Sequence, residues 1–281
     1  MKGNSPFISP LRDSLHSYLF FSFCLLTLQL LCKPSELGKI ALIMLACFVS
    51  GVVIEFTQPY VGGNTSIVDI YYNLVGIICA SVMFVALRKP LKRKLSATVF
   101  AVIWLSTCLA MPLYGAFVLT QRDQAAPILL SFDQSWERQL WRPGSSLVSL
   151  SRAPQAWQAN QSLSAKITFT NANYSGFHLK HPLSDWSPYT ALTFEIFSKQ
   201  KETLNLVLRI HDKTHNQAYD DRYNQRFRVE PGLNTYRISL AQIAQAPSQR
   251  TLDMQNIDGL GIFMVAPKGL PSIYLDNLGL D

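Results

Sequence analysis

Six polar side chains stand at the ends of apolar segments in the first third of the chain, and their types suit acid–base or metal chemistry. They are Asp13, His16, Glu55, Gln58, Asp69 and Asn73. Glu55 and Gln58 are three residues apart, so on a helix they share one face. Asp69 and Asn73, four apart, also share a face. The loop between the two pairs is short, so we expect the groups to gather at one membrane surface. A carboxylate there could act as a general base, and with a histidine the set offers metal ligands or a proton relay.

Each of these residues also has a purely structural interpretation. Asp69 and Asn73 can cap a helix or bond a neighbouring backbone, and Asp13 can cap the helix that follows it. Glu55 and Gln58 fit the polar rim of a helix at a membrane interface. His16 taken alone fits a structural role. Convergence on one surface is what favours a site.

Four apolar runs surround these residues, and each approaches the ~20 residues that a helix needs to cross a ~30 Å hydrocarbon core. We predict helices over about residues 15–32, 39–57, 69–88 and 96–120, which together form a transmembrane domain of residues 1–121. The lipid bilayer is therefore the first predicted partner.

Basic loops indicate the orientation of these helices. Residues 88–94 read RKPLKRK and should be cytoplasmic, whereas the loop over residues 59–68 carries no charge and should face outside. Four crossings then place the chain after residue 120 outside as well. The pattern predicts a multi-pass protein of the bacterial inner (plasma) membrane with an extracytoplasmic, periplasmic C-terminal domain.

The spacing of the polar residues resembles the VanZ-like family of membrane proteins. The matching elements are E-x-x-Q at 55–58, D-x-x-x-N-x-x-G at 69–76, and the Asp13/His16 pair before an apolar run. The family motif usually also has an arginine in the turn, and residues 62–66 here read GGNTS without one. The resemblance covers roughly the first 120 residues and implies a helical membrane domain.

The composition changes near residue 121, and short β-rich runs separated by turns follow to the C-terminus. Leu204, Leu206, Leu208 and Ile210 alternate with more polar residues, as in a half-buried strand. Ten or so such runs predict an all-β jelly-roll sandwich over residues 125–281, which contains no cysteine. The fold class is thus a transmembrane bundle of about four helices followed by an all-β sandwich.

Aromatic and basic side chains of the second half are candidates for binding sugar rings and hydroxyl groups. They are Trp186, Tyr219, Arg222, Tyr223 and Arg226. The alternative is that Trp186 packs a strand edge and Arg222 is a surface charge. We read His178 and His181 as surface histidines. Asp133 and Asp276, near the two ends of the domain, are candidates for a structural calcium site, and no other cofactor is indicated.

Three segments of the second half resemble galactose-binding-like jelly rolls and family 11 carbohydrate-binding modules. They are residues 184–195 (SDWSPYTALTFE), 220–227 (DDRYNQRF) and 273–278 (IYLDNL). The resemblance covers roughly residues 125–281 and implies a carbohydrate-binding-like domain.

These patterns predict a VanZ-like membrane protein that presents a carbohydrate-binding-like domain, with an envelope-associated role in binding a glycan or cell-wall saccharide. The sequence has no nucleophile motif, phosphate loop or zinc spacing, which favours binding over catalysis. The small net charge of the second half gives no support for nucleic-acid binding. Two alternatives stay open: a membrane enzyme or transporter acting on a lipid or lipid-linked glycan, and a structural protein-docking module.

Overall fold

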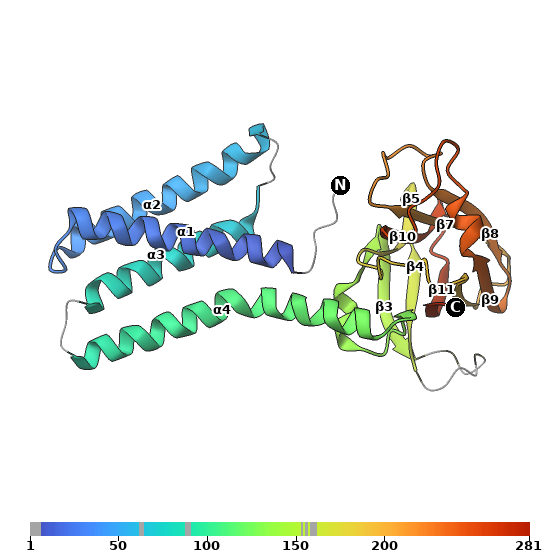
Figure 1. Ribbon diagram of the computed structural model, residues 1–281, viewed down its shortest axis with the longest axis horizontal. Helices are drawn as coiled ribbons and strands as arrows, with labels where there is room; N and C mark the ends of the chain where they lie inside the picture. Colours follow the sequence, from blue (N-terminus) through green and yellow to red (C-terminus); the bar gives the residue numbers. More distant parts are fainter. Residues whose placement is uncertain (1–6, 62–64, 88–90, 153, 155–156, 158–161) are drawn as a thin grey trace. The chain divides into compact units, whose positions relative to one another are not determined.

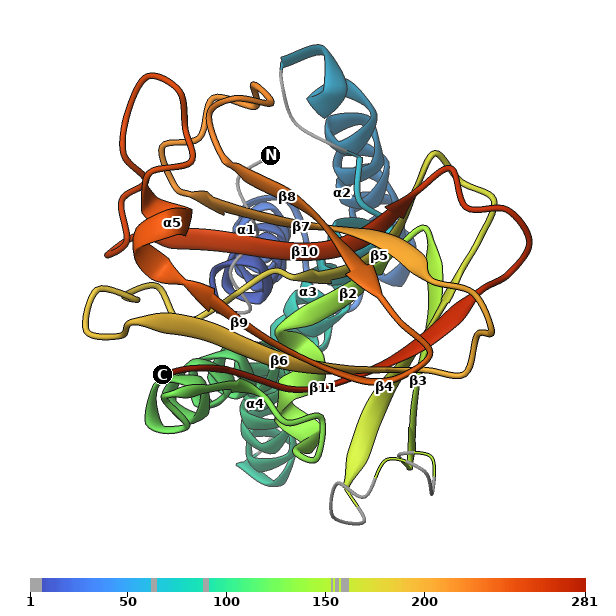
Figure 2. The same cartoon turned by 90° about the vertical axis from the view of Figure 1, so that its right-hand side faces the viewer.

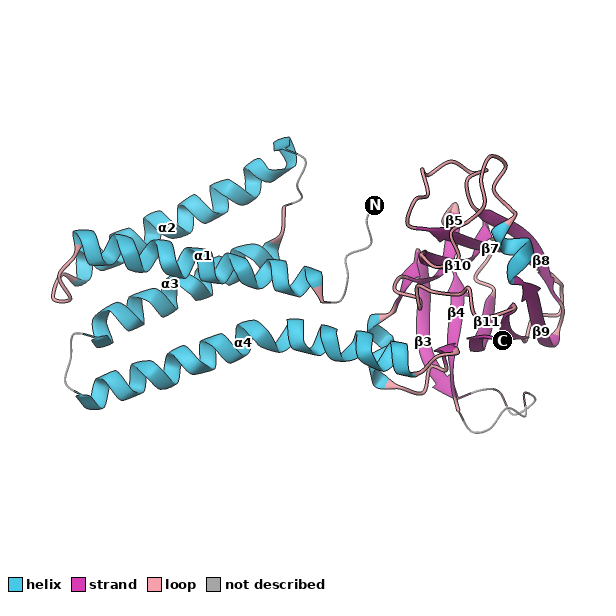
Figure 3. Cartoon of the chain, in the orientation of Figure 1, coloured by secondary structure: helices cyan, strands magenta, loops and turns pink. Residues whose placement is uncertain are grey.

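The computed structural model of the protein describes residues 7–61, 65–87, 91–152, 154, 157 and 162–281. The glycine-rich part of the turn, residues 62–64, and residues 88–90 of the basic loop lie outside this set. Four helices are followed by antiparallel sheets packed as a sandwich (Figures 1 and 3), so the predicted fold class is confirmed. The chain divides into two compact units, residues 4–117 and 118–281, and each is described separately below.

The helical unit is built from segments long and apolar enough to cross a membrane. They are α1 (Ile8–Leu31), α2 (Leu37–Thr57), α3 (Ile67–Leu87) and α4 (Leu91–Gln124), with a short 3-10 turn over Gln58–Val61. Many of their large apolar side chains are exposed, among them Leu19, Leu30, Leu42 and Val53. Such a surface suits contact with lipid.

Helices α1 and α3 pack closely because α3 has a glycine where they touch. A Cβ atom on Gly76 would lie 2.2 Å from the backbone oxygen of Ser17, so no larger residue fits without movement. The indole of Trp104 on α4 stacks on Phe21 at 4.5 Å between ring centroids and donates a hydrogen bond to the Ser17 hydroxyl at 3.0 Å. Small residues at the contact and polar bonds between helices are typical of membrane bundles.

The second unit is a sandwich of two antiparallel sheets (Figure 2). The first sheet has the order β3-β4-β11-β6-β9, with β1 paired to β11, and the second has the order β2-β5-β10-β7-β8. The first sheet's strands are β1 (Ile128–Leu130), β3 (Ser146–Arg152), β4 (Leu163–Phe169), β6 (Ala191–Ser198), β9 (Gly232–Ser239) and β11 (Ser272–Leu280). The second sheet's strands are β2 (Trp141–Gly144), β5 (Tyr174–Leu179), β7 (Leu204–Asp212), β8 (Tyr223–Val229) and β10 (Ile257–Val265). A 3-10 turn, Ser135–Gln139, and a short helix α5, Leu240–Ala244, complete the unit.

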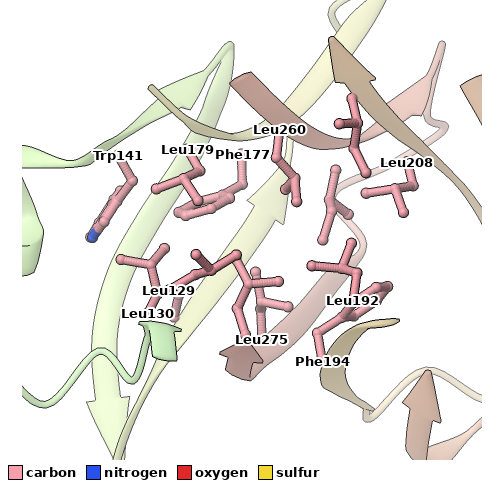
Figure 4. Close-up of a cluster of buried hydrophobic side chains, with 14 of the residues drawn as sticks. Leu129, Leu130, Trp141, Phe177, Leu179, Leu192, Phe194, Leu208, Leu260 and Leu275 are labelled. Atoms are coloured by element: carbon pink, nitrogen blue, oxygen red, sulfur yellow. The ribbon is translucent and has the colours of Figure 1, made fainter. Parts of the chain in front are cut away.

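One apolar core fills the space between the two sheets. Figure 4 shows Phe177 and Leu260 from the second sheet beside Leu192 and Leu275 from the first. Alternate residues of each strand point inward, so the remaining residues of the second sheet form its outward face. The end of α4 belongs to this unit: Val118 is part of the sandwich core, and Arg122 donates a hydrogen bond to the Pro182 carbonyl at 3.2 Å.

Candidate functional site

The helical unit brings three ionisable side chains of the predicted polar cluster together. His16 Nδ1 lies 3.7 Å from Glu55 Oε1, and His16 Nε2 lies 3.9 Å from Asp69 Oδ2. One ligand atom from each residue lies within 4.8 Å of the others. Glu55 is fully buried and Asp69 is 5% exposed. We call this group the His16–Glu55–Asp69 cluster.

The remaining predicted cluster residues lie around these three. Gln58 donates from Nε2 to Glu55 Oε1 at 3.1 Å, and the Ser66 N–H donates to Glu55 Oε2 at 3.1 Å. Asp13 pairs with Arg12 at 3.7 Å. Asn73 lies one helical turn beyond Asp69 and is buried.

The predicted sugar-binding residues of the sandwich do not form one surface. Trp186 is fully buried in the core and donates from Nε1 to the Leu183 carbonyl at 2.7 Å, so its ring cannot stack on a ligand, and it leaves the predicted set. Tyr223 is also buried. Tyr219 is 71% exposed, and the Arg222 guanidinium lies 5.8 Å from its ring centroid. Arg226 is exposed on β8.

The structure instead places a pocket of about 570 Å³ on the outward side of the second sheet. Strands β2, β5, β7 and β10 and the loop after β7 supply the polar side chains that line it. They include Arg142, His178, Lys180, Arg209, His211, Asp212, Lys213, His215 and Asp258. We call it the second-sheet pocket. The predicted residue Arg222 contacts this lining, with its Nη1 3.4 Å from His215 Nε2.

Two glycines of β10 form part of the lining and leave space for histidine rings. Gly261 pairs with His178 on β5, and Gly259 pairs with His211 on β7. A Cβ atom on Gly261 would lie 2.8 Å from His178 Nδ1, and one on Gly259 would lie 2.8 Å from His211 Nε2. Any larger residue at either position would displace a ring, so these glycines decide the shape of the pocket.

Cationic groups dominate the pocket. Arg142, Lys180, Arg209 and Lys213 face two carboxylates, and one of these, Asp212, is already paired with Arg250. Burial, reinforced by Arg142 and Arg209, lowers the pKa of His178 to about 4. Burial and Arg142 likewise lower the pKa of Lys180. Burial is the larger cause of both shifts and the neighbouring positive charges add to it, and a bound anion would offset those charges.

Two guanidinium nitrogens at or beside the second-sheet pocket have no hydrogen-bond acceptor within the described part of the chain. They are the buried Nε atoms of Arg209 and Arg222. Buried donors are normally paired, and an unpaired one calls for an explanation such as an ion. The arrangement can therefore bind a carboxylate, sulfate or phosphate group.

An ion-pair network fixes the loops beside the pocket. The Arg250 guanidinium bonds the Asp212 carboxylate through Nη1 and Nη2, at 2.5 and 2.9 Å, and also pairs with Asp221. Asp212 further accepts the N–H groups of Thr214 and Asp253. Burial raises the pKa of Asp212, but the hydrogen bonds from Arg250 and the Asp253 N–H outweigh it, and the net shift is downward.

The predicted surface role of His178 is corrected, because the ring is in the pocket lining. The period-2 pattern of β7 was a usable signal, since Arg209 and His211 alternate with core residues and must share the outward face. The spacing of Arg142 and His178 in the sequence does not show that they lie side by side on neighbouring strands of the second sheet. The pairing of Arg142 with His178, and of Gly261 with both His178 and Arg209, is a matter of register.

Of the candidate calcium residues, Asp276 lies on β11, a central strand of the first sheet, and the charge of Asp133 acts on it. Asp276 is 1% exposed, and its register partner on β6 is Glu195. Burial, together with the charges of Asp133 and Glu195, raises the pKa of Asp276 to about 7. Carboxylate oxygens are the ligands calcium prefers, so this chemistry fits the predicted ion, which stays a prediction.

The raised pKa of Asp276 predicts a pH-dependent stability. Its folded pKa of about 7 exceeds the ordinary value near 3.9, so stability is full below pH ~4 and falls as pH rises toward 7. Asp276→Asn should remove this dependence and raise the free energy of unfolding at pH 8 by roughly 4 kcal/mol. Thermal midpoints of the full chain in detergent, from pH 4 to 8, measure it. The exposed Asp123→Asn is the control, and parallel profiles for Asp276→Asn and the wild type would refute the effect.

Comparisons with known proteins give solved structures that align with about half of this chain. No protein-family model matches the sequence, and no curated protein matches it. An exo-beta-agarase aligns with a TM-score of 0.44 at 16% identity, covering 56% of this chain and 25% of that chain. A family 11 carbohydrate-binding module from Clostridium thermocellum, in complex with a beta-1,3-1,4-mixed-linked tetrasaccharide, aligns at 0.41 and 18% identity, covering 55% and 94%. A non-crystalline cellulose specific carbohydrate-binding module, CBM28, aligns at 0.37 and 14%, covering 56% and 93%.

The aligned region is thus about a quarter of the agarase's length. All three TM-scores lie below 0.5, so the ligand class has to be argued from the site of this chain. The architecture stands on its own strands and sheet order: a membrane-type helical unit followed by a β-sandwich.

Proposed function

We propose that this chain is a membrane-anchored binding protein whose sandwich holds an anionic saccharide in the second-sheet pocket. One observation carries the proposal: four cationic side chains and three histidines line one pocket, where Asp258 is the carboxylate left outside the Arg250 network. Fixed guanidinium groups bind carboxylate, sulfate and phosphate groups through paired N–H donors. The volume of about 570 Å³ lies in the range of small-molecule sites, about 300–1,000 Å³.

The histidines of the second-sheet pocket are the reason for proposing that the ligand's anionic group is part of a sugar. Their lowered pKa values keep His178 and His211 neutral at pH 7, so each offers one donor and one acceptor. Neutral groups with both functions suit sugar hydroxyls, while Arg142 and Arg209 bind the acid. A uronic acid or a sulfated or phosphorylated sugar combines both chemistries.

The helical unit would hold this domain at the outer face of a bacterial inner membrane, as the VanZ-like resemblance and the basic loop suggest. The four apolar helices support membrane association. A topology reporter fused after Asp281, with a control insertion at residues 92–94, tests the orientation. A cytoplasmic signal at Asp281 would overturn the envelope role.

A glycan panel tests the ligand class directly. The full chain in detergent should bind acidic oligosaccharides and not their neutral counterparts, with affinity that weakens as salt is raised. Arg209→Gln should reduce affinity at least tenfold. Arg237→Gln, on the exposed side of the first sheet, is the matched control and should bind normally. Equal binding of neutral and acidic members, or no binding at all, would refute the proposal.

Binding should also tighten as pH falls. The pKa of free His178 is about 4, and a bound anion raises it, so binding takes up a proton between the two values. Affinity therefore rises as pH drops from 7.5 toward 5, by up to about tenfold per unit of pKa change in the complex. Titration calorimetry across this range measures it. His178→Gln should flatten the curve, and a curve that falls toward low pH would contradict the assignment.

A second candidate function is a membrane enzyme or transporter acting on a lipid or lipid-linked glycan. The observation that favours it is the buried His16–Glu55–Asp69 cluster in the helical unit. Replacing Glu55 and Asp69 together by alanine should then abolish the cellular phenotype of the gene at normal protein level. An unchanged phenotype would remove this candidate and leave the binding role intact.

A further inference from the structure

The His16–Glu55–Asp69 cluster holds more negative charge than its surroundings balance. Glu55 is fully buried, Asp69 is 5% exposed, and His16 is the basic group that the structure places against both carboxylates. Two buried carboxylates next to each other repel and lose their hydration, so they need a cation or protons. The distances of 3.7 and 3.9 Å from the imidazole are too long for hydrogen bonds. The histidine therefore does not satisfy them directly.

Unpaired polar atoms at the same place point independently to a missing partner. Asp69 Oδ1 is buried and accepts no hydrogen bond from any described residue. One turn along α3, Asn73 is 1% exposed, and both atoms of its amide are likewise unpaired within the described part of the chain. Most buried polar atoms have a partner, and an ion or water is the usual explanation when the protein supplies none.

The geometry of the three ligand atoms suits a metal ion. A carboxylate oxygen from Glu55, one from Asp69 and one ring nitrogen of His16 lie within 4.8 Å of one another. Ligands about 2.0–2.2 Å from a zinc-like ion are separated from each other by about 3–4 Å, so side-chain movements that shorten the longest separation by about 1 Å would close the site. The donors come from α1, α2 and α3, and contacts outside the cluster hold them, among them the Ser66 N–H on Glu55.

We propose that His16, Glu55 and Asp69 bind one divalent transition-metal ion of the zinc type. One imidazole and two carboxylates form a borderline ligand set that favours such an ion over magnesium or calcium, which prefer all-oxygen sites. Three protein ligands leave at least one coordination position open. The His16 side chain is 21% exposed. The open coordination position is therefore accessible from outside the helix bundle. The site is independent of the second-sheet pocket.

Metal binding to the full chain in detergent is the test, with protein purified without a histidine tag and stripped with chelator. Equilibrium dialysis against Zn²⁺ should give one bound equivalent per chain. The near-isosteric Glu55→Gln and Asp69→Asn should each lower the affinity at least tenfold. Glu36→Gln, in the loop between α1 and α2, is the control and should bind as the wild type does. Binding of less than a tenth of an equivalent, or unchanged binding in both cluster variants, overturns the proposal.

Cobalt substitution separates this site from the five cysteines, and it uses the wild-type chain, so it does not depend on the stability of a variant. Co²⁺ in a site with nitrogen and oxygen ligands should show visible d–d absorption without a thiolate-to-cobalt charge-transfer band. The five cysteines are all buried and free. A charge-transfer band would place the metal on them and overturn the assignment.

Discussion

Replacing Asp212 by alanine is expected to lower the free energy of unfolding of the sandwich by about 3–5 kcal/mol. The carboxylate is 1% exposed and accepts hydrogen bonds from Arg250, Thr214 and the Asp253 N–H. Without it, Asp221 is the remaining carboxylate partner of the partly buried Arg250 guanidinium. The Thr214 N–H, the Thr214 hydroxyl and the Asp253 N–H also lose the acceptor that Asp212 provides. Removing one partner of a buried pair costs much more than the pair contributes net, because the remaining charge stays desolvated.

The thermal midpoint of the full chain, followed by tryptophan fluorescence, measures this effect. Four of the five tryptophans lie between residues 136 and 186, so the signal reports mainly on the sandwich. We expect a fall of about 10 °C for a domain of this size. Glu202→Ala, exposed in the loop before β7, is the control, with a change of at most about 0.5 kcal/mol. A fall of less than 2 °C would show that the network does not hold the loops.

Gly76→Val is expected to separate α1 from α3 and to destabilise the helical unit by about 3 kcal/mol or more. The new Cβ atom would lie 2.2 Å from the Ser17 oxygen and 3.0 Å from the Phe21 nitrogen. Both are backbone atoms, so a rotamer change cannot relieve the clash and the helices must move. His16 lies one residue before Ser17, so the His16–Glu55–Asp69 cluster should open as well.

Gly38→Val on α2 is the matched control for this substitution. A Cβ atom on Gly38 meets nothing within 4 Å, so the change adds the same side chain to a membrane helix without a clash. In detergent, Gly76→Val should have a lower thermal midpoint than the wild type and should bind zinc weakly or not at all. Gly38→Val should keep the thermal midpoint and the zinc affinity of the wild type. Equal stability of the two variants would show that α1 and α3 tolerate a wider separation.

Local sequence pattern predicted the membrane helices, most of the strands and one pair of residues in the membrane cluster. Apolar runs of about 20 residues predicted the helices, and period-2 alternation predicted β7, because both signals depend only on neighbouring residues. The spacing of Glu55 and Gln58 fixed their shared face, and the structure shows their hydrogen bond. Local pattern does not predict strand β2, because Trp141–Gly144 contains Pro143 and a four-residue edge strand with proline resembles a turn.

Tertiary structure alone decided which side chains meet. His16 reaches Glu55 and Asp69 because Gly76 lets α1 approach α3, a contact between residues about sixty positions apart. Trp186 looked like a ligand residue and is a core residue, since an aromatic ring serves either purpose and only the sheet packing chooses. The second-sheet pocket joins Arg142, His178 and Arg209 through strand register. Register depends on the pairing of distant strands, which no local pattern encodes.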